Sequence, residues 1–279
     1  MAHDDPPRLG IYEKALVPDP RWPHFFEQVR ASGFDFAELA VDESAERIRR
    51  LGWNNRQRDH VRQAAHAHGV TIDTITLSAH RATPLGSADP EVRVRSRTML
   101  RQAIALAGDL GCTRVQIAGY FAFYEPPHPE ARRWFLDGLA DATAGAEAAG
   151  VVLAIENVDG HDITSIPTAL EILDELNDKT VRLYIDVGNL AGNQRDVAAE
   201  LRTGLPYAHA VQLKDARPGE FRRVPFDHGT VPWPAVMTVL ADAGYPVPIG
   251  LELWNDDHSP TLARSAADWF NRTSKAADR

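Results

Sequence analysis

The sequence predicts an α/β protein that folds as one (β/α)8-barrel domain over residues 1–279. Short β-rich runs alternate with longer stretches of helical spacing, and this pair recurs about eight times. Strict alternation implies a parallel sheet, and eight units are the number that closes a barrel. An open doubly wound sheet is the alternative. The run GIYEKALVPDP after the first strand, however, lacks the glycine-rich phosphate loop typical of that class.

The elements follow one another in a regular order. The eight strands are expected to begin near Leu9, Phe34, Val70, Thr113, Val151, Val181, Tyr207 and Val247. Before the last strand, apolar residues at helical spacing form one stripe that can pack on the sheet: Trp233, Val236, Met237 and Leu240. A helix C-terminus favours a residue that tolerates the left-handed conformation. We expect this role for the glycines that precede a strand, namely Gly33, Gly69, Gly111, Gly150, Gly204 and Gly244.

The charge balance limits the kind of partner. There are 30 Lys and Arg against 39 Asp and Glu, so the chain lacks the basic surface that grips nucleic-acid phosphates. A small anionic substrate remains compatible with this charge, because a few local cations can hold one phosphate. We therefore expect a small-molecule partner and no nucleic acid. Pairing of two chains into a homodimer through an exposed barrel face is also compatible with the sequence.

Cysteine content and hydropathy limit the metal chemistry and the location. Cys112 is the only cysteine, so no internal disulfide can form and any metal ion must use oxygen or imidazole ligands. The longest apolar runs are shorter than the roughly 18 residues of a membrane span. The opening MAHDDPPRL lacks the basic start and the apolar core of a signal peptide. We expect a cytoplasmic protein that does not cross a membrane.

Oxygen-bearing side chains end the last four predicted strands. Successive side chains of a strand point to opposite faces, so parity separates helix-facing positions from interior ones. In the run VVLAIE, Val151, Leu153 and Ile155 share the outer face, whereas Ala154 and Glu156 share the inner face. The same division in the next three strands places one polar side chain each at matching depth. The four inward residues are Glu156, Asp186, Gln212 and Glu252.

Three carboxylates buried together need a compensating cation, since desolvation and mutual repulsion would otherwise favour their protonation. We therefore predict one divalent metal ion at the C-terminal ends of the strands, where the active sites of such barrels lie. All-oxygen coordination favours Mn²⁺ or Mg²⁺ and leaves Co²⁺ or Zn²⁺ open. The predicted ligands are Glu156, Asp186, Gln212 and Glu252. The alternative for each acid is that it caps the next helix or pairs with an arginine.

More polar residues are predicted at the same end of the barrel. A purely structural interior would favour branched apolar side chains at these positions, so the pattern indicates a polar site. The inward-facing set is Glu38, Thr74, Thr76, Ser78, His80, Gln116 and Tyr120, and Lys214 follows Gln212 by two residues. Structural alternatives stay open for His80 as a satisfied core histidine, for Tyr120 as a packing residue, and for Lys214 as a partner of Glu252 or Asp215.

Six segments of the chain resemble one enzyme family: GIYEKAL, GFDFAELAVDES, LSAHRATPLGS, QIAGY, IDVGNL and LKDARPGEFRRVPF. That family is the L-ribulose-5-phosphate (L-xylulose-5-phosphate) 3-epimerases of pentose and ascorbate catabolism, sometimes named hexulose-6-phosphate isomerases. It belongs to the xylose isomerase-like TIM barrels. The similarity runs from about Leu9 to the last helix. The resemblance implies an isomerase of carbohydrate metabolism with this barrel fold.

The resemblance also implies a ligand set. In that family a glutamate, an aspartate, a histidine and a second glutamate on the last four strands hold the metal. By motif they correspond to Glu156 in LAIEN, Asp186 in IDVGN, Gln212 in QLKD and Glu252 in LELWN. Gln212 stands where the family has the histidine of HVKD. An amide oxygen in place of an imidazole nitrogen favours Mn²⁺ or Mg²⁺ over softer ions.

Two other departures from the family bear on the site. His209 has the wrong parity to replace the missing histidine, and His228 in PFDHG is the remaining candidate. The family's HRRFPLGS reads HRATPLGS here, so one arginine near the expected substrate end is missing. A preference for an unphosphorylated ketose is therefore an open alternative.

The expected reaction is epimerisation of a ketopentose 5-phosphate at C3, between L-xylulose 5-phosphate and L-ribulose 5-phosphate. It requires two acid/base groups on opposite sides of the carbon and an electrophile for the enediolate. We predict Glu156 and Glu252 as the catalytic groups, and the metal ion as a Lewis acid. The substrate-binding candidates, including the cations available for a phosphate, are Lys14, His80, Arg81, Tyr120, Lys214 and Arg217.

Other functions use similar residues. Aldose–ketose isomerisation uses the same metal ligands, and a dehydratase of cyclic polyols is a third chemistry for this scaffold. A catalytically silent barrel that binds sugar phosphates is the alternative of another class, because fold alone does not fix function and the fourth ligand differs. An abasic-site endonuclease of a related barrel would need many histidine ligands and a basic surface, and neither is present.

Overall fold

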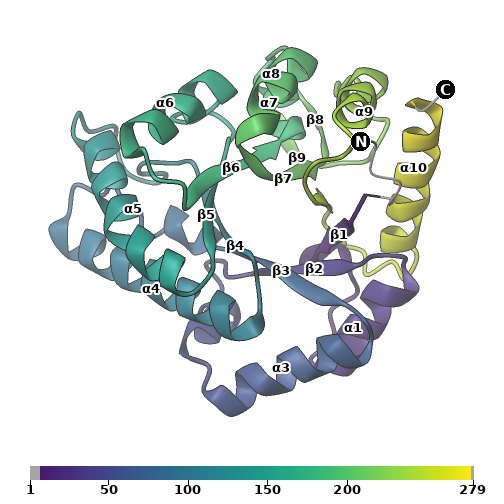
Figure 1. Cartoon of the computed structure of the whole chain (residues 1–279), viewed down its shortest axis with the longest axis horizontal. Coiled ribbons are helices and arrows are strands. Elements are labelled where there is room, and N and C mark those ends of the chain that lie inside the picture. Colours follow the sequence, from purple (N-terminus) through teal and green to yellow (C-terminus); the bar gives the residue numbers. More distant parts are fainter. Residues whose placement is uncertain (1–6, 278–279) are drawn as a thin grey trace.

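A closed parallel barrel forms the centre of the chain, for which the computed structural model describes residues 7–277. The strand order around the barrel is β1-β10-β7-β6-β5-β4-β3-β2, and helices surround it (Figure 1). The predicted (β/α)8 barrel is therefore confirmed, and each strand begins within two residues of its expected start. The barrel strands are β1 (Leu9–Tyr12), β2 (Phe36–Ala40), β3 (Thr71–Thr76), β4 (Arg114–Ala118), β5 (Val152–Glu156), β6 (Val181–Asp186), β7 (Ala208–Leu213) and β10 (Ile249–Leu251).

Helices follow the strands and cover the outside of the barrel (Figure 1). Local signals set their ends: in α4, Asp89 accepts a hydrogen bond from Glu91 N, Pro90 fills the first turn, and Gly111 ends the helix in the left-handed conformation. The α-helices are α1 (Trp22–Ala31), α2 (Ala45–Ile48), α3 (Asn55–Ala67), α4 (Pro90–Leu110), α5 (Ala131–Ala148), α6 (Ile166–Leu176), α7 (Val187–Gly192), α8 (Val197–Gly204), α9 (Trp233–Asp242) and α10 (Leu262–Ala277). Short 3-10 turns are η1 (Glu13–Ala15), η2 (Arg49–Gly52), η3 (Ser78–Arg81) and η4 (Leu205–Tyr207).

One glycine does not have its expected role. Five of the six glycines predicted to end helices have positive φ, but Gly204 has a φ of −82°. A glycine fits at position 204 for a steric reason instead, because a Cβ there would lie 2.7 Å from Ile185 Cδ1. The left-handed residue before β6 is Asn177, with a φ of 45°.

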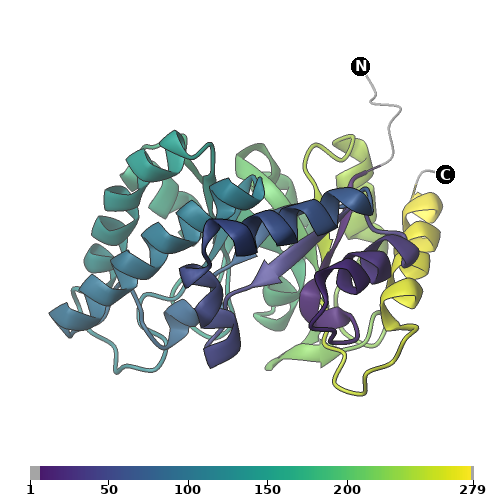
Figure 2. The same cartoon turned by 90° about the horizontal axis from the view of Figure 1, so that it is seen from below.

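A small antiparallel hairpin interrupts the regular alternation after β7. Its strands are β8 (Asp215–Arg217) and β9 (Glu220–Val224), and the hairpin contacts α7. Figure 2 shows it at the lower edge of the barrel, on the side where the loop before α10 also lies. The sequence did not predict this hairpin, because its strands are short and polar and lack an alternating apolar pattern.

Strand parity divides the core as predicted. Leu153, Ile185 and Val211 belong to the large apolar core beneath the helices, whereas Ala154, Tyr184 and Ala210 form a separate cluster inside the barrel. The interior positions are therefore distinct from the helix-facing ones, and the side chains that end this inner face meet at the mouth of the barrel.

The barrel interior below the mouth is polar. The Tyr184 hydroxyl donates to Glu38 Oε1 at 2.6 Å, and the Thr74 hydroxyl donates to the same oxygen at 2.9 Å. Arg114 donates to Thr74 Oγ1 at 2.9 Å. Gly250 leaves room for this layer, since a Cβ there would lie 2.9 Å from the Tyr184 hydroxyl. Hydrogen bonding thus compensates for the burial of polar groups along the barrel axis.

Within the described residues, no helix is both long and apolar enough to cross a membrane.

Candidate active site

A cavity of about 1510 Å³ opens at the C-terminal ends of the barrel strands. Its location agrees with the general rule for enzymes with this fold. Of the ten residues predicted to act in catalysis, metal binding or substrate binding, six line the cavity: Lys14, Arg81, Tyr120, Glu156, Lys214 and Glu252. Thr76, Ser78 and Gln116 of the predicted inward-facing set line it as well.

The strand register brings the predicted ligands to one end of the barrel. Glu156 pairs in register with Tyr184, and Asp186 pairs with Gln212. Asp186 divides its two oxygens between two roles. Its Oδ1 accepts a hydrogen bond from Asn189 N at 2.8 Å and so caps α7, which is the structural role that the sequence left open. Its Oδ2 faces the other acids and pairs with the ammonium group of Lys214.

The cation among these acids is the ammonium group of Lys214. Its Nζ lies 2.8 Å from Asp186 Oδ2 and 3.1 Å from Glu252 Oε2. The sequence left Glu252 and Asp215 as possible partners of Lys214, and the structure shows the pair with Glu252. Asp215 accepts hydrogen bonds from backbone N–H groups and from Trp233. Gly188 makes room for Lys214, because a Cβ on Gly188 would overlap the lysine side chain.

Gln212 closes the acidic cluster from below. With its nitrogen toward the acids, its amide donates to Asp186 Oδ2 at 3.1 Å and to Glu156 Oε1 at 3.3 Å. Rotated by half a turn, the same amide presents its oxygen to the same two carboxylates. Three oxygen-bearing side chains therefore converge at hydrogen-bonding distance, and the amide can serve either as a donor to the acids or as a ligand beside them.

Burial and mutual proximity perturb the acids. Burial and then the charge of Asp186 raise the pKa of Glu156 well above its usual value. Burial also raises the pKa of Asp186, although Lys214 opposes the shift. Burial alone would lower the pKa of Lys214, but Asp186 and Glu252 outweigh it and raise the pKa. Such shifted groups in a cavity are typical of functional sites.

The donor set fits a hard divalent cation by its chemistry. Carboxylate and amide oxygens are the ligands that Mn²⁺ and Mg²⁺ prefer, and three of the four predicted ligands already lie within 3.3 Å of a neighbour in the set. In residues 7–277, no group of three or more His, Cys, Asp and Glu side chains is arranged to hold a metal ion. The Lys214 ammonium lies between Asp186 and Glu252.

Comparison with known proteins identifies the family. A model of the xylose isomerase-like TIM barrel matches residues 26–273. The chain belongs to the xylose isomerase-like TIM barrel family. It is 39% identical over 271 residues to L-ribulose-5-phosphate 3-epimerase UlaE of Escherichia coli K12, covering 96% of this chain and 95% of that protein. A putative L-ribulose-5-phosphate 3-epimerase of Shigella dysenteriae serotype 1 is equally similar. The resemblance stated from the six segments is thus confirmed.

Solved structures show the same barrel. The chain matches a D-psicose 3-epimerase from Clostridium cellulolyticum H10 with a TM-score of 0.80 at 16% identity, over 96% of this chain and 99% of that one. An L-ribulose 3-epimerase matches with a TM-score of 0.79 at 19% identity, over 98% and 96% of the two chains. Epimerases of this barrel family generally bind a divalent metal ion.

Two of the predicted substrate-binding residues, His80 and Arg217, do not line the cavity. His80 is buried, and its Nε2 lies 3.3 Å from the Ser96 carbonyl oxygen, so it is a core histidine. Arg217 lies on the exposed hairpin, where it donates to the His228 carbonyl oxygen and to Glu220. Neither side chain lines the cavity, so the expectation that they bind substrate is not supported.

The histidines near Gln212 do not replace it. His209 lies near the start of β7, at the opposite end of the strand from Gln212, and accepts a hydrogen bond from Arg114 Nε at 3.1 Å. His228 is exposed on the loop after the hairpin and does not line the cavity. Gln212 is therefore the residue that lies beside the acids at the end of β7.

Sequence reasoning missed several cavity residues. Arg222 and Arg223 extend from the unpredicted hairpin and pair with Asp159 and Asp256. Asn189 donates to Glu156 Oε1 at 3.3 Å, and the Trp254 ring lies 5.9 Å from Lys214 Nζ. The segment FRRVPF contains the two arginines, but their position depends on the turn of the hairpin, which parity does not predict.

The buried state of His80 predicts a pH-dependent stability. Burial lowers the pKa of His80 to about 4, below the usual value near 6.5. As the pH falls, His80 therefore takes up a proton in the unfolded chain before it does so in the folded protein. The neutral histidine contributes to stability fully above pH 6.5, and this contribution is lost as the pH falls from 6.5 to 4. Between pH 7 and pH 5, protonation of His80 should lower the free energy of unfolding of the wild type by about 2 kcal/mol. The variant His80→Asn should not show this decrease. Urea unfolding at the two pH values measures the difference.

A matched control separates this effect from general acid sensitivity. His66 is exposed on α3, so His66→Asn should keep the wild-type pH dependence. Equal pH profiles for the wild type and His80→Asn would contradict the assignment of His80 as a neutral core residue.

Proposed function

We propose that this chain is a metal-dependent 3-epimerase of ketopentose 5-phosphates that interconverts L-xylulose 5-phosphate and L-ribulose 5-phosphate. The observation that carries the proposal is the placement of Glu156 and Glu252. Both side chains line the same cavity, and they come from β5 and the end of β10, which β6 and β7 separate around the barrel. Two carboxyl groups can thereby reach one substrate carbon from different directions. The 39% identity to a named L-ribulose-5-phosphate 3-epimerase supports the same reaction.

The reaction moves one proton on and off C3, next to the C2 carbonyl. In one direction Glu156 removes the proton and Glu252 returns one to the opposite face, and in the other direction the roles are exchanged. Burial and the neighbouring Asp186 raise the pKa of Glu156, and shifted pKa values of this kind are typical of groups that exchange protons in active sites. Asn189 donates to Glu156, and Lys214 donates to Glu252, so both carboxylates are oriented at the cavity wall.

A divalent ion, Mn²⁺ or Mg²⁺ by the all-oxygen donor set, would be held by Glu156, Asp186, Gln212 and Glu252. Bound there, it would supply Lewis-acid stabilisation of the negative charge that develops on the substrate oxygens. Asp186 and Gln212 are buried beneath the cavity wall, so their role is to hold the ion and the two catalytic glutamates in place.

Isotope exchange tests the proposed reaction. Turnover of L-ribulose 5-phosphate in deuterium oxide should place deuterium at C3, because the proton returned to C3 comes from a group that exchanges with solvent. Glu156→Gln and Glu252→Gln should each lose about 100- to 10,000-fold in kcat, since each removes one acid/base group. NMR of the product and a coupled assay provide the two measurements.

The control is Glu175→Gln, because Glu175 is an exposed carboxylate of α6 paired with Arg132, and its activity should stay at the wild-type level. Deuterium at C1 or C2 instead of C3 would indicate aldose–ketose isomerisation. No exchange at all in the metal-loaded protein would support the silent sugar-phosphate-binding alternative.

Replacing the glutamine by the family's histidine tests the ligand role of Gln212. An imidazole nitrogen suits Co²⁺ and Zn²⁺ better than an amide oxygen does, so Gln212→His should bind these ions more tightly relative to Mn²⁺. Titration calorimetry of the wild type and the variant with each ion measures the preference. An unchanged preference would show that the residue at 212 does not contact the ion.

A further inference from the structure

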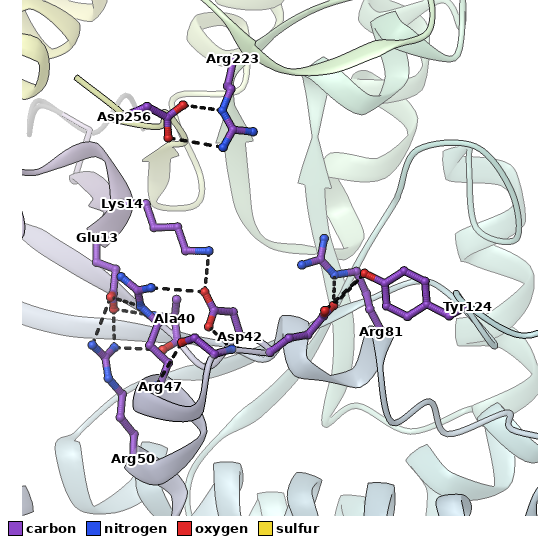
Figure 3. A network of polar contacts seen from close by, with 12 residues as sticks. Glu13, Lys14, Ala40, Asp42, Arg47, Arg50, Arg81, Tyr124, Arg223 and Asp256 are labelled. Atoms are coloured by element: carbon purple, nitrogen blue, oxygen red, sulfur yellow. Dashed lines mark hydrogen bonds and ion pairs between the residues drawn. The ribbon is translucent and has the colours of Figure 1, made fainter. Parts of the chain in front are cut away.

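Cations hold several of the carboxylates around the cavity. Lys14 Nζ lies 2.7 Å from Asp42 Oδ2, and Figure 3 shows this pair beside the turn that follows β2. At the ends of β7 and β10, Lys214 Nζ lies 3.1 Å from Glu252 Oε2. A charged donor of this kind orients a carboxylate and also stabilises its negative charge. Of the two proposed catalytic groups, Glu252 is therefore oriented by a cation.

Glu156, the other proposed catalytic group, is oriented by neutral amides instead. Asn189 Nδ2 donates to Glu156 Oε1 at 3.3 Å, and the Gln212 amide can donate to the same oxygen at 3.3 Å. Holding Oε1 also fixes the direction of Oε2, because both oxygens belong to one planar carboxyl group. The Gln212 amide is shared between Glu156 and Asp186. Asn189 is thus the side-chain donor that acts on Glu156 by itself.

Hydrogen bonds hold the Asn189 amide in one orientation. Its Nδ2 carries two N–H groups, and these reach two acceptors, Glu156 Oε1 and, at 2.8 Å, the Asn157 carbonyl oxygen. The backbone N–H of Asn189 donates to Asp186 Oδ1 at 2.8 Å and so belongs to the cap of α7. Asn189 is buried, as is every other residue of α7. The side chain therefore cannot turn away from Glu156 without leaving buried N–H groups unpaired.

Asn157 fixes the backbone beneath this contact. The register of β5 with β6 pairs Glu156 with Tyr184, two residues before Asp186. Beyond that pair, the Asn157 side chain supplies the hydrogen bonds that a neighbouring strand would otherwise make. Asp186 N donates to Asn157 Oδ1, and Asn157 Nδ2 donates to the Asp186 carbonyl oxygen, both at 2.9 Å. Two buried asparagines, Asn157 and Asn189, thus join the end of β5 to the start of α7.

We propose that Asn189 is a positioning residue for Glu156, and that it serves the proton transfer on one face of C3 only. This inference rests on the proposed 3-epimerase function. Glu252 has its own donor in Lys214, so loss of the Asn189 amide leaves the transfer on the opposite face supported. A hydrogen bond to a charged group that aligns the reacting carboxylate corresponds to about 10- to 100-fold in the rate of the step that Glu156 performs.

Deuterium partitioning tests this one-sided effect. Each epimer is turned over separately in deuterium oxide, and deuterium at C3 of the remaining substrate is measured relative to the product formed. With one epimer, Glu252 removes the proton and returns a solvent deuteron to the same face, which labels the substrate, whereas delivery by Glu156 to the opposite face gives product. Asn189→Ala slows the delivery by Glu156, so the ratio should rise about tenfold or more. With the other epimer the ratio should fall, because Glu156 then has to return the deuteron.

Asn193→Ala is the matched control. Asn193 follows Asn189 by about one turn, at the end of α7, and its Nδ2 donates to the Val158 carbonyl oxygen at 2.8 Å rather than to an acid. Melting temperatures check that both variants fold, and the control should keep the wild-type ratio with each epimer. The positioning role would be overturned by a wild-type ratio in Asn189→Ala, or by an equal change with both epimers, which general loosening of the site would give.

A crystal structure of Asn189→Ala keeps this inference separate from the proposed function. The carboxyl group of Glu156 should turn from its wild-type direction, while both hydrogen bonds between Asn157 and Asp186 remain. An unmoved Glu156 would overturn the positioning role even in an active epimerase. A displaced Glu156, together with a wild type that turns over neither pentulose phosphate, would support the positioning role and overturn the proposed function.

Discussion

The burial of acidic side chains at the mouth of the barrel is the constraint on which the site depends. Glu156, Asp186, Gln212 and Glu252 are brought there by the register of four neighbouring strands. Like charges in a buried site are stable only with a compensating cation or a proton. Lys214 supplies positive charge between Asp186 and Glu252, and the same oxygens suit a divalent ion. Charge compensation therefore links the stability of the barrel mouth to its chemistry.

The hydrogen-bonded polar layer beneath the mouth of the barrel supports these acids. Tyr184 and Thr74 both donate to Glu38, and Gly250 provides the space in which Glu38 and Tyr184 meet. Tyr184 and Gly250 each precede a predicted ligand by two residues on the same inner face, so packing below the site fixes the strands that carry Asp186 and Glu252. At the opposite wall, Asp42 and Glu43 orient Lys14 and Arg81 in a similar way. The cavity thus has carboxylates on one side and, on the other, lysine and arginine side chains paired with carboxylates.

Parity and chain order were sufficient to predict the barrel and the depth of the four inward residues, because both depend on the strict alternation of a strand. The partners of individual charged residues could not be predicted in the same way. Lys214 reaches Asp186, a residue of another strand, only because Gly188 leaves space for it. His80 shares the parity of the polar rim, yet its position on η3 turns it toward α4. The β8–β9 hairpin depends on turn geometry rather than on an apolar pattern, so Arg222 and Arg223 were missed.

The central claim is that one divalent ion binds among these four side chains. Crystals grown with Mn²⁺ and measured at a wavelength sensitive to manganese provide the most direct test. The account predicts one strong anomalous peak at bonding distance from Glu156, Asp186, Gln212 and Glu252, with the Lys214 ammonium moved away from Asp186. The account would be contradicted by a map in which Lys214 still pairs with Asp186 and Glu252 and no manganese lies among the four side chains.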